Sequence, residues 1–311
     1  MSTLPATAIV REVGLRDGLQ SIQTILPTAQ KIEWVKQAYA AGQREIEVGS
    51  FVPPKLMPQL ADTWDVLAFA KTLPGLTASV LIPNLKGAER ALEGDADLMV
   101  LPLSASHAHS LANLRKTPDE VVQELARIRA ARDASGKKTL IEGGVGTAFG
   151  CTLQGEVGDD EVLWLADQLA GAGVNEIGLS DTTGMANPAQ VRRLFKKLTQ
   201  AIGSKVGAAH MHNTRGLGLA NCLAALDVGV TTFDSSQGGL GGCPYAPGAS
   251  GNVVTEDLVF MLESMGVSTG IDLERLMAAR IHLQKGLPNE PIYGMTPEAG
   301  LPKTWKAAAH D

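Results

Sequence analysis

The residues of this sequence best suited to chemistry are a His-x-His pair, an Arg-Asp pair and a few scattered carboxylates and amides. His210 and His212 flank a methionine, and Arg16 directly precedes Asp17. Imidazole nitrogens together with carboxylate and amide oxygens form mixed sites for divalent ions such as Mg²⁺ or Mn²⁺. The pattern therefore indicates a metal site whose ligands come from distant parts of the chain.

The His-x-His pair predicts a geometry if it lies on a strand. Side chains alternate along a strand, so both imidazoles would point to one side. For an isolated pair, two hydrogen-bonded core histidines are an equally good interpretation. A metal site is favoured because Asp17 and Asn252 belong to loops that could approach the same point.

Arg16 could stabilise a developing enolate oxygen, since a guanidinium is a fixed hydrogen-bond donor. The alternative is an ordinary Arg-Asp ion pair, which usually means little. Glu47 could orient the guanidinium or be a satisfied carboxylate at a strand end.

Cys243 lies in the glycine-dense segment GGLGGCPYAPGASGN, residues 238–252. Glycines permit close approach to a ligand, and a thiol near a metal and an arginine would have a lowered pKa suited to proton transfer. A buried apolar filler is the alternative. Cys151 and Cys222 have no such surroundings and are interpreted as structural.

Eight short β-rich runs alternate with helical patterns and would position these residues. The predicted strands are 8–13, 44–48, 78–82, 98–101, 139–143, 176–179, 206–210 and 231–234. Parallel strands need crossover helices, and eight of them favour an α/β (β/α)8 barrel over an open sheet. No GxGxxG follows the first strand, which argues against a dinucleotide-binding fold. In such barrels, functional residues follow the carboxyl ends of strands, where most of these candidates fall.

Helix signals lie between the strands. Two apolar stripes are predicted, one by Ile32, Val35 and Tyr39 and one by Val162, Leu165, Ala166 and Leu169. Two helix starts are predicted, by Thr117-Pro118-Asp119-Glu120 as a capping box and by Asn187-Pro188.

Composition fits one domain over residues 1–311, with closing helices and a tail from about residue 269. A net charge of −6 argues against nucleic-acid binding. We see no signal sequence or apolar run long enough for a membrane span. Three cysteines without a signal indicate reduced thiols and a cytoplasmic enzyme.

Five segments resemble the 3-hydroxy-3-methylglutaryl-CoA lyase family within the DRE-TIM metallolyases. They are EVGLRDGLQ (12–20), IEVGSFVPPKLMPQLAD (46–62), LIPNLKGAERAL (81–92), the His-x-His strand and GLGGCPYAPGASGNVVTEDLVFML (239–262). The resemblance implies retro-Claisen cleavage of a 3-hydroxyacyl-CoA to acetyl-CoA and a keto acid.

The resemblance also implies residue roles. The metal ligands would be Asp17, His210, His212 and Asn252. The catalytic set would be Arg16, Asp17, Glu47, His210 and the acid/base Cys243. Gln20, Ser180 and Arg215 would meet the substrate, and Asn113 would contact coenzyme A. A homodimer or higher homo-oligomer is expected from the family.

Two segments depart from the family pattern and concern acyl specificity. Asn213-Thr214-Arg215-Gly216 stands where the lyases usually have Asp-Thr-Tyr-Gly, and Gly178-Leu179-Ser180-Asp181 stands where they have Ser-Leu-Gly-Asp. Gly178 removes a hydroxyl expected to touch the acyl group. The alternatives are an aldolase of a 4-hydroxy-2-oxo acid, a Claisen-type synthase and a non-catalytic metal- or ligand-binding barrel.

Overall fold

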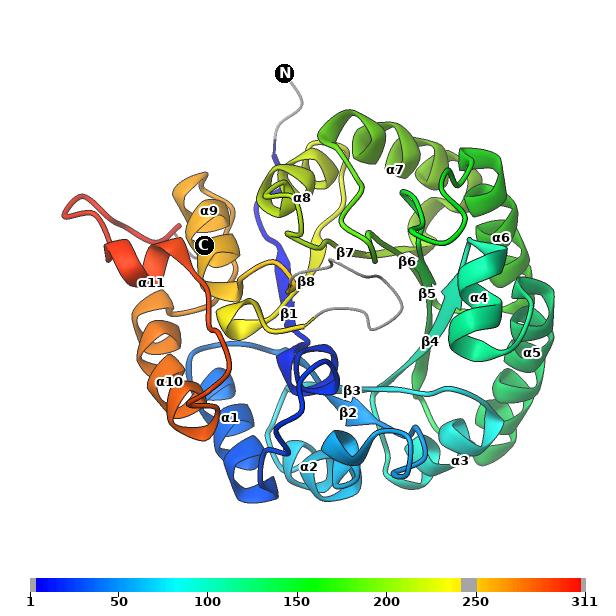
Figure 1. Cartoon of the computed structure of the whole chain (residues 1–311), viewed down its shortest axis with the longest axis horizontal. Coiled ribbons are helices and arrows are strands. Elements are labelled where there is room, and N and C mark those ends of the chain that lie inside the picture. Colours follow the sequence, from blue (N-terminus) through cyan, green and yellow to red (C-terminus); the bar gives the residue numbers. More distant parts are fainter. Residues whose placement is uncertain (1–3, 242–250, 309–311) are drawn as a thin grey trace.

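A closed parallel β-barrel forms the centre of the molecule in the computed structural model, which describes residues 4–241 and 251–308 (Figure 1). Its strands run in chain order from β1 to β8 around the barrel. They are β1 (Ile9–Glu12), β2 (Glu45–Ser50), β3 (Thr77–Leu81), β4 (Leu98–Ser104), β5 (Leu140–Gly146), β6 (Glu176–Ser180), β7 (Val206–His210) and β8 (Thr232–Ser235). Pairing of β1 with β8 closes the ring, so the predicted (β/α)8 barrel is confirmed.

All eight predicted strands are present, with differences at their ends. β4 and β5 each continue three residues further than predicted. β2 continues to Ser50, which places Glu47 inside the strand rather than at its end. The extension has a physical cause, because Gly49 and Ser50 pair with Val80 and Leu81 of β3 after a register shift.

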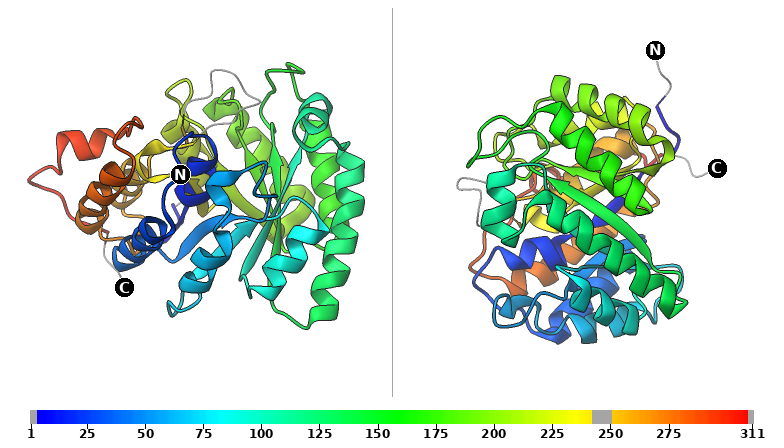
Figure 2. Two further views of the ribbon diagram at one scale, coloured as in Figure 1. Left: turned by 60° about the horizontal axis from the view of Figure 1, so that its bottom comes forward. Right: turned by 90° about the vertical axis from the view of Figure 1, so that its right-hand side faces the viewer.

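Helices surround the barrel as an outer ring (Figures 1 and 2). They are α1 (Thr28–Ala40), α2 (Thr63–Ala70), α3 (Leu85–Glu93), α4 (His107–Leu114), α5 (Pro118–Ser135), α6 (Asp159–Ala172), α7 (Pro188–Ile202), α8 (Gly218–Leu226), α9 (Thr255–Ser264), α10 (Leu273–Gly286) and α11 (Met295–Ala299). The capping box is confirmed, since Thr117 and Glu120 bond to each other's backbone N–H. Asn187 likewise caps α7 by accepting from the N–H of Gln190.

The apolar stripe predicted on α6 is confirmed, because all four of its members are buried. The stripe predicted on α1 is wrong in part: Val35 is buried, but Ile32 and Tyr39 are only half-buried. The buried face of α1 instead includes Lys31. Its ammonium can be buried because it donates to the backbone oxygen of Gln59 and pairs with Asp62.

The last helices close the ring and then leave it. α10 packs against α1 and α9, and α11 packs against α9 at the outside of the molecule (Figure 2). None of the described helices is long and apolar enough to cross a membrane.

Candidate active site

The chain leaves β1 through a single π-helical turn, Gly14–Gly18, which carries Arg16 and Asp17. Turns of this kind are rare and occur often at functional sites. A side chain at Gly14 has no room, because an added Cβ would lie 2.5 Å from Glu12 Oε1 and 2.8 Å from the ring of Trp34. The glycine therefore allows the turn to fold tightly over the barrel.

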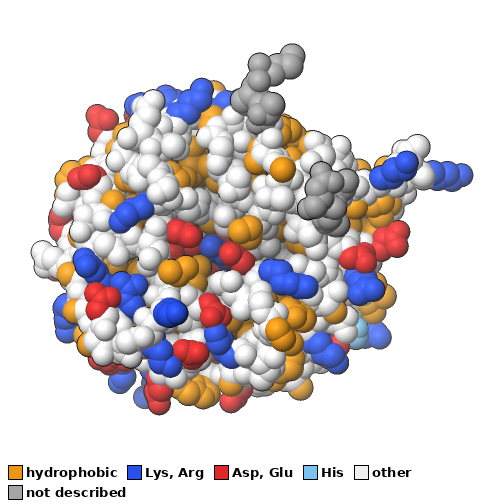
Figure 3. Space-filling model, turned by 180° about the vertical axis from the view of Figure 1, so that it is seen from behind, with side chains coloured by type: hydrophobic (Ala, Val, Ile, Leu, Met, Phe, Trp, Pro, Cys, Tyr) orange, Lys and Arg blue, Asp and Glu red, His pale blue; other side chains and the backbone are white. Residues whose placement is uncertain are grey.

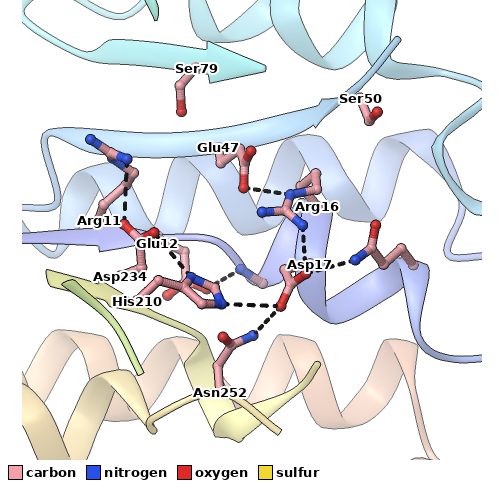
Figure 4. A network of polar contacts seen from close by, with 12 residues as sticks. Arg11, Glu12, Arg16, Asp17, Glu47, Ser50, Ser79, His210, Asp234 and Asn252 are labelled. Carbon is pink, nitrogen blue, oxygen red and sulfur yellow. Dashed lines mark hydrogen bonds and ion pairs between the residues drawn. The ribbon is translucent and has the colours of Figure 1, made fainter. Parts of the chain in front are cut away.

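Arg16 lies between two carboxylates (Figure 4). Its Nε donates to Glu47 Oε2 at 2.6 Å, and its Nη1 donates to Asp17 Oδ1 at 2.5 Å. Burial alone would raise the pKa of Asp17, but the Arg16 guanidinium and the two nearby imidazoles hold that pKa well below its usual range. Asp17 is therefore ionised at neutral pH, and the guanidinium is held in one direction.

His210 ends β7 and His212 lies two residues beyond it, paired with Asn252 in an isolated bridge, and the two imidazoles face each other. Their Nε2 atoms are 3.1 Å apart, and each lies 3.8 Å from Asp17 Oδ2. One ligand atom from each of the three residues falls within 4.8 Å of the others. The barrel thus brings together two imidazoles and a carboxylate that are nearly 200 positions apart in the chain.

Asn252 reaches the same point through a short backbone pairing. An isolated antiparallel bridge pairs Asn252 with His212, two residues after the end of β7. The Asn252 Nδ2 donates to Asp17 Oδ2 at 2.7 Å, and its Oδ1 is buried with no hydrogen-bond partner. Gly241 passes so close that an added Cβ would lie 2.3 Å from Asn252 Nδ2.

The chemistry of this donor set fits a divalent metal. Two imidazoles, one ionised carboxylate and one amide oxygen without a partner supply the nitrogen and oxygen ligands that such ions prefer. The Nδ1 atom of His210 contacts Asp234 Oδ2 at 3.1 Å, an outer contact that commonly fixes the orientation of a metal-binding imidazole.

Asp234, Arg11 and Glu142 had no role in the sequence analysis, yet they form a buried ion cluster beneath the histidines. Arg11 Nη1 lies 2.8 Å from Glu142 Oε2 and 3.5 Å from Asp234 Oδ1. β1, β5 and β8 contribute one residue each, so only barrel closure brings them together. An arginine inside a predicted barrel strand was the signal available, because it needs buried partners.

A cavity of about 910 Å³ opens above this cluster. The candidate residues that line it are Arg16, Asp17, Gln20, Asn113, Ser180, His210 and His212. Gln20 also donates to Asp17 Oδ1 at 2.7 Å.

Three other candidate site residues do not line the cavity. Glu47 and Asn252 bond instead to Arg16 and Asp17 respectively. Arg215 is turned away, because its Nη1 donates to the backbone oxygens of Thr183 and Gly184. Cys243 lies outside the described residues.

Known proteins were compared with this chain. A family model described as HMGL-like matches residues 8–282. The hydroxymethylglutaryl-CoA lyase YngG of Bacillus subtilis (strain 168) is 41% identical over 275 residues, covering 88% of this chain and 91% of the relative. The mitochondrial hydroxymethylglutaryl-CoA lyase of Homo sapiens is 40% identical over 280 residues, covering 90% of this chain and 85% of the relative.

A solved structure supports the same relationship. An HMG-CoA lyase from Acinetobacter baumannii, in complex with coenzyme A and 3-methylmalate, is similar with a TM-score of 0.91 and 41% identity, covering 98% of this chain and 99% of that one. These findings confirm the predicted lyase relationship over the aldolase and synthase alternatives. The chain belongs to the HMGL-like family.

Proposed function

We propose that this protein cleaves 3-hydroxy-3-methylglutaryl-CoA, or a closely related 3-hydroxyacyl-CoA, to acetyl-CoA and a 3-oxo acid. The observation that carries the proposal is the convergence of one guanidinium, one ionised carboxylate and two imidazoles in a single cavity. The relatives named as hydroxymethylglutaryl-CoA lyases support the acyl class.

The reaction involves two proton transfers and breaks one carbon–carbon bond. The C3 hydroxyl loses its proton, its oxygen becomes the ketone of the 3-oxo acid, and the C2–C3 bond breaks. The bonding electrons leave as the enolate of acetyl-CoA, which then takes a proton at C2. The enzyme must therefore stabilise a negative oxygen on the thioester and exchange two protons.

Arg16 is suited to the enolate oxygen. It lines the cavity, and its remaining guanidinium N–H groups are not needed by Glu47 or Asp17. Because Glu47 is buried within β2, it holds the guanidinium in a fixed direction before the substrate binds. Fixed donors of this kind stabilise developing charge without reorganisation.

Asp17, His210, His212 and Asn252 would hold a divalent metal, which we propose to be Mg²⁺ or Mn²⁺. Such an ion supplies Lewis-acid chemistry, lowering the pKa of a bound hydroxyl group. The pairing of Asp17 with Arg16 keeps this carboxylate ionised and therefore available as a ligand.

We assign the protonation of the enolate to Cys243, on the strength of the family resemblance of its segment. Gly241, on one side of this segment, lies against Asn252 and Asp17. We also propose that Asn113 contacts the coenzyme A moiety, since it lines the cavity beside Arg115 and Lys116.

The test is steady-state release of acetyl-CoA from 3-hydroxy-3-methylglutaryl-CoA, with Mg²⁺ or Mn²⁺ added and with metal removed by a chelator. We expect metal-dependent cleavage that falls at least about 100-fold in Cys243→Ala. Cys222→Ala is the matched control, since Cys222 is a buried thiol on α8. Equal loss in both variants would contradict the role of Cys243.

We further propose a cytoplasmic homodimer or higher homo-oligomer. Both described cysteines are free thiols, which suits a reducing compartment. Light scattering coupled to size-exclusion chromatography measures the mass, and a monomer of 32.6 kDa would contradict the oligomer.

A further inference from the structure

Two neighbouring barrel strands, β5 and β6, line the cavity largely with glycines, and Glu142 and Ser180 are the exceptions. Glu142, Gly144 and Gly146 alternate along β5, and Gly178 lies beside them on β6. All four line the cavity. The wall of the barrel next to the histidines is therefore made largely of glycine.

The space at these glycines is used in two different ways. An added Cβ at Gly144 would meet only Val100 at 3.6 Å and the Leu101 backbone oxygen at 3.9 Å, so the protein leaves this position open. At Gly178 the space is filled, because an added Cβ would lie 2.7 Å from Glu142 Oε1. The Glu142 carboxylate thus occupies the place of a side chain at position 178.

Glu142 offers an unused acceptor to the cavity. Glu142 is only 2% exposed, and its Oε2 accepts a hydrogen bond from Arg11 Nη1 at 2.8 Å. Among the described residues, the only donor to this carboxylate is Arg11, which bonds to Oε2 and not to Oε1. Because Glu142 lines the cavity, its Oε1 can accept a hydrogen bond from a ligand.

The charges around Glu142 favour a ligand group that donates a hydrogen bond over a ligand carboxylate. Arg11 also lies 3.2 Å from Glu45 and 3.5 Å from Asp234, so one guanidinium serves three carboxylates. Burial, with the charge of Asp234, raises the pKa of Glu142 to about 7. Both its ionised and its protonated form keep an oxygen able to accept a hydrogen bond.

The cluster lies far below the mouth of the cavity. Glu142 is the third residue of β5, and Gly144 and Gly146 follow it toward the carboxyl end. Charged side chains of both signs gather at the centre of the face opposite the mouth (Figure 3). Glu142 therefore lines the cavity deeper than Gly144 and Gly146 do.

We propose that Glu142 and the open position at Gly144 form a specificity subsite for a 3-hydroxyacyl-CoA whose C3 substituent is larger than methyl and carries a hydroxyl group. This inference rests on the proposed lyase function. The hydroxyl donates to Glu142 Oε1, and the extra atom fits the space that the glycine leaves.

The test compares two substrates, 3-hydroxy-3-(hydroxymethyl)glutaryl-CoA (the hydroxymethyl probe) and 3-hydroxy-3-methylglutaryl-CoA (the methyl probe). Cleavage of the C2–C3 bond gives acetyl-CoA from both, with 4-hydroxy-3-oxobutanoate from the first and acetoacetate from the second. No co-reactant is needed. We expect kcat/KM for the hydroxymethyl probe to exceed that for the methyl probe at least about tenfold.

Two variants test the two halves of the subsite. In Glu142→Gln the amide oxygen stays with Arg11 and the amide NH₂ faces the cavity, so the ratio of the two kcat/KM values falls about tenfold. Gly144→Ala fills the open position and lowers the same ratio. Gly171→Ala is the control for adding a methyl group, because nothing lies within 4 Å of that position.

The outcomes separate the two proposals. If the wild-type enzyme cleaves the methyl probe as well as or better than the hydroxymethyl probe, the subsite is wrong and the lyase function stands. If it cleaves neither probe with metal present, the lyase function fails and the subsite with it. An unchanged ratio in both Glu142→Gln and Gly144→Ala, with folding verified by thermal unfolding, also overturns the subsite.

Discussion

Glu12 is the last residue of β1, and Asp17 lies in the turn that follows it. The two carboxylates are only five residues apart but have opposite surroundings. Glu12 is fully buried and accepts from the backbone N–H of Gly14, the backbone N–H of Gln237 and the hydroxyl of Thr255. Burial raises its pKa to about 7, and these neutral donors offset the effect only in part. Asp17 faces a guanidinium and two imidazoles, which hold its pKa well below the usual range.

The difference shows how one fold assigns two tasks to the same chemical group. Neutral donors around Glu12 tie β1 to the turn after it and to the loop after β8, so this carboxylate holds the barrel mouth together. Charged neighbours around Asp17 keep it ionised at the cavity surface. Burial is similar at both sites, and the charge of the partners decides between scaffold and chemistry.

Removing the charge of Asp17 should have the largest effect on activity. Asp17→Asn keeps the shape but loses the carboxylate that faces both imidazoles. We expect kcat/KM to fall roughly 1,000-fold and Mn²⁺ affinity, measured by calorimetry, to fall with it.

Asp95→Asn is the control for this change, since Asp95 is an exposed carboxylate paired with Lys137. Mn²⁺ binding by Asp17→Asn at wild-type affinity would rule out Asp17 as a ligand.

Truncating Glu12 should damage stability more than chemistry. Glu12→Ala leaves three buried donors without an acceptor. Each costs about 1–3 kcal/mol, so we expect the free energy of unfolding in urea to fall by at least about 3 kcal/mol. Activity per folded molecule should stay much closer to wild type than in Asp17→Asn, and a loss of similar size would contradict the comparison.

Glu12 should also make stability depend on pH. Its pKa in the folded state lies near 7, above the ordinary glutamate value of 4.5, so the folded protein holds this proton more tightly than the unfolded chain. The contribution is fully present below about pH 4.5 and is lost as pH rises through 7, at no more than about 1.4 kcal/mol per pH unit.

Glu12→Gln removes this titration while keeping an oxygen acceptor. Urea unfolding at pH 5, 6, 7 and 8 should therefore give a shallower decline for the variant than for the wild type. Parallel curves would show that Glu12 does not hold the proton.

The smallest effect is expected at Glu47, which acts on the reaction only through Arg16. Glu47→Gln keeps an oxygen acceptor for Arg16 Nε but loses the charge. We expect kcat to fall about tenfold with little change in the melting temperature. Glu33→Gln, on the surface of α1, is the control. An unchanged kcat would mean that Asp17 alone orients the guanidinium.

Much of the architecture could be predicted because its signals are local. Short β-rich runs located all eight strands, and the capping box at Thr117 located the start of α5. The buried face of α1 could not be predicted from such local signals. Lys31 is buried only because Asp62 and Gln59, about thirty residues later, satisfy its ammonium.

The candidate site also has one part that follows from local sequence signals and another that depends on the tertiary structure. By itself the sequence determined that both histidines come at the carboxyl end of the seventh strand. β7 ends at His210, however, and His212 is placed by its bridge to Asn252, which is a tertiary contact. Only the tertiary structure decided that Asn252 reaches Asp17, that Asp234 contacts His210, and that Glu142 fills the place of a side chain at Gly178. These contacts depend on barrel closure and on the register between strands, which bring residues together across the barrel irrespective of their distance along the chain.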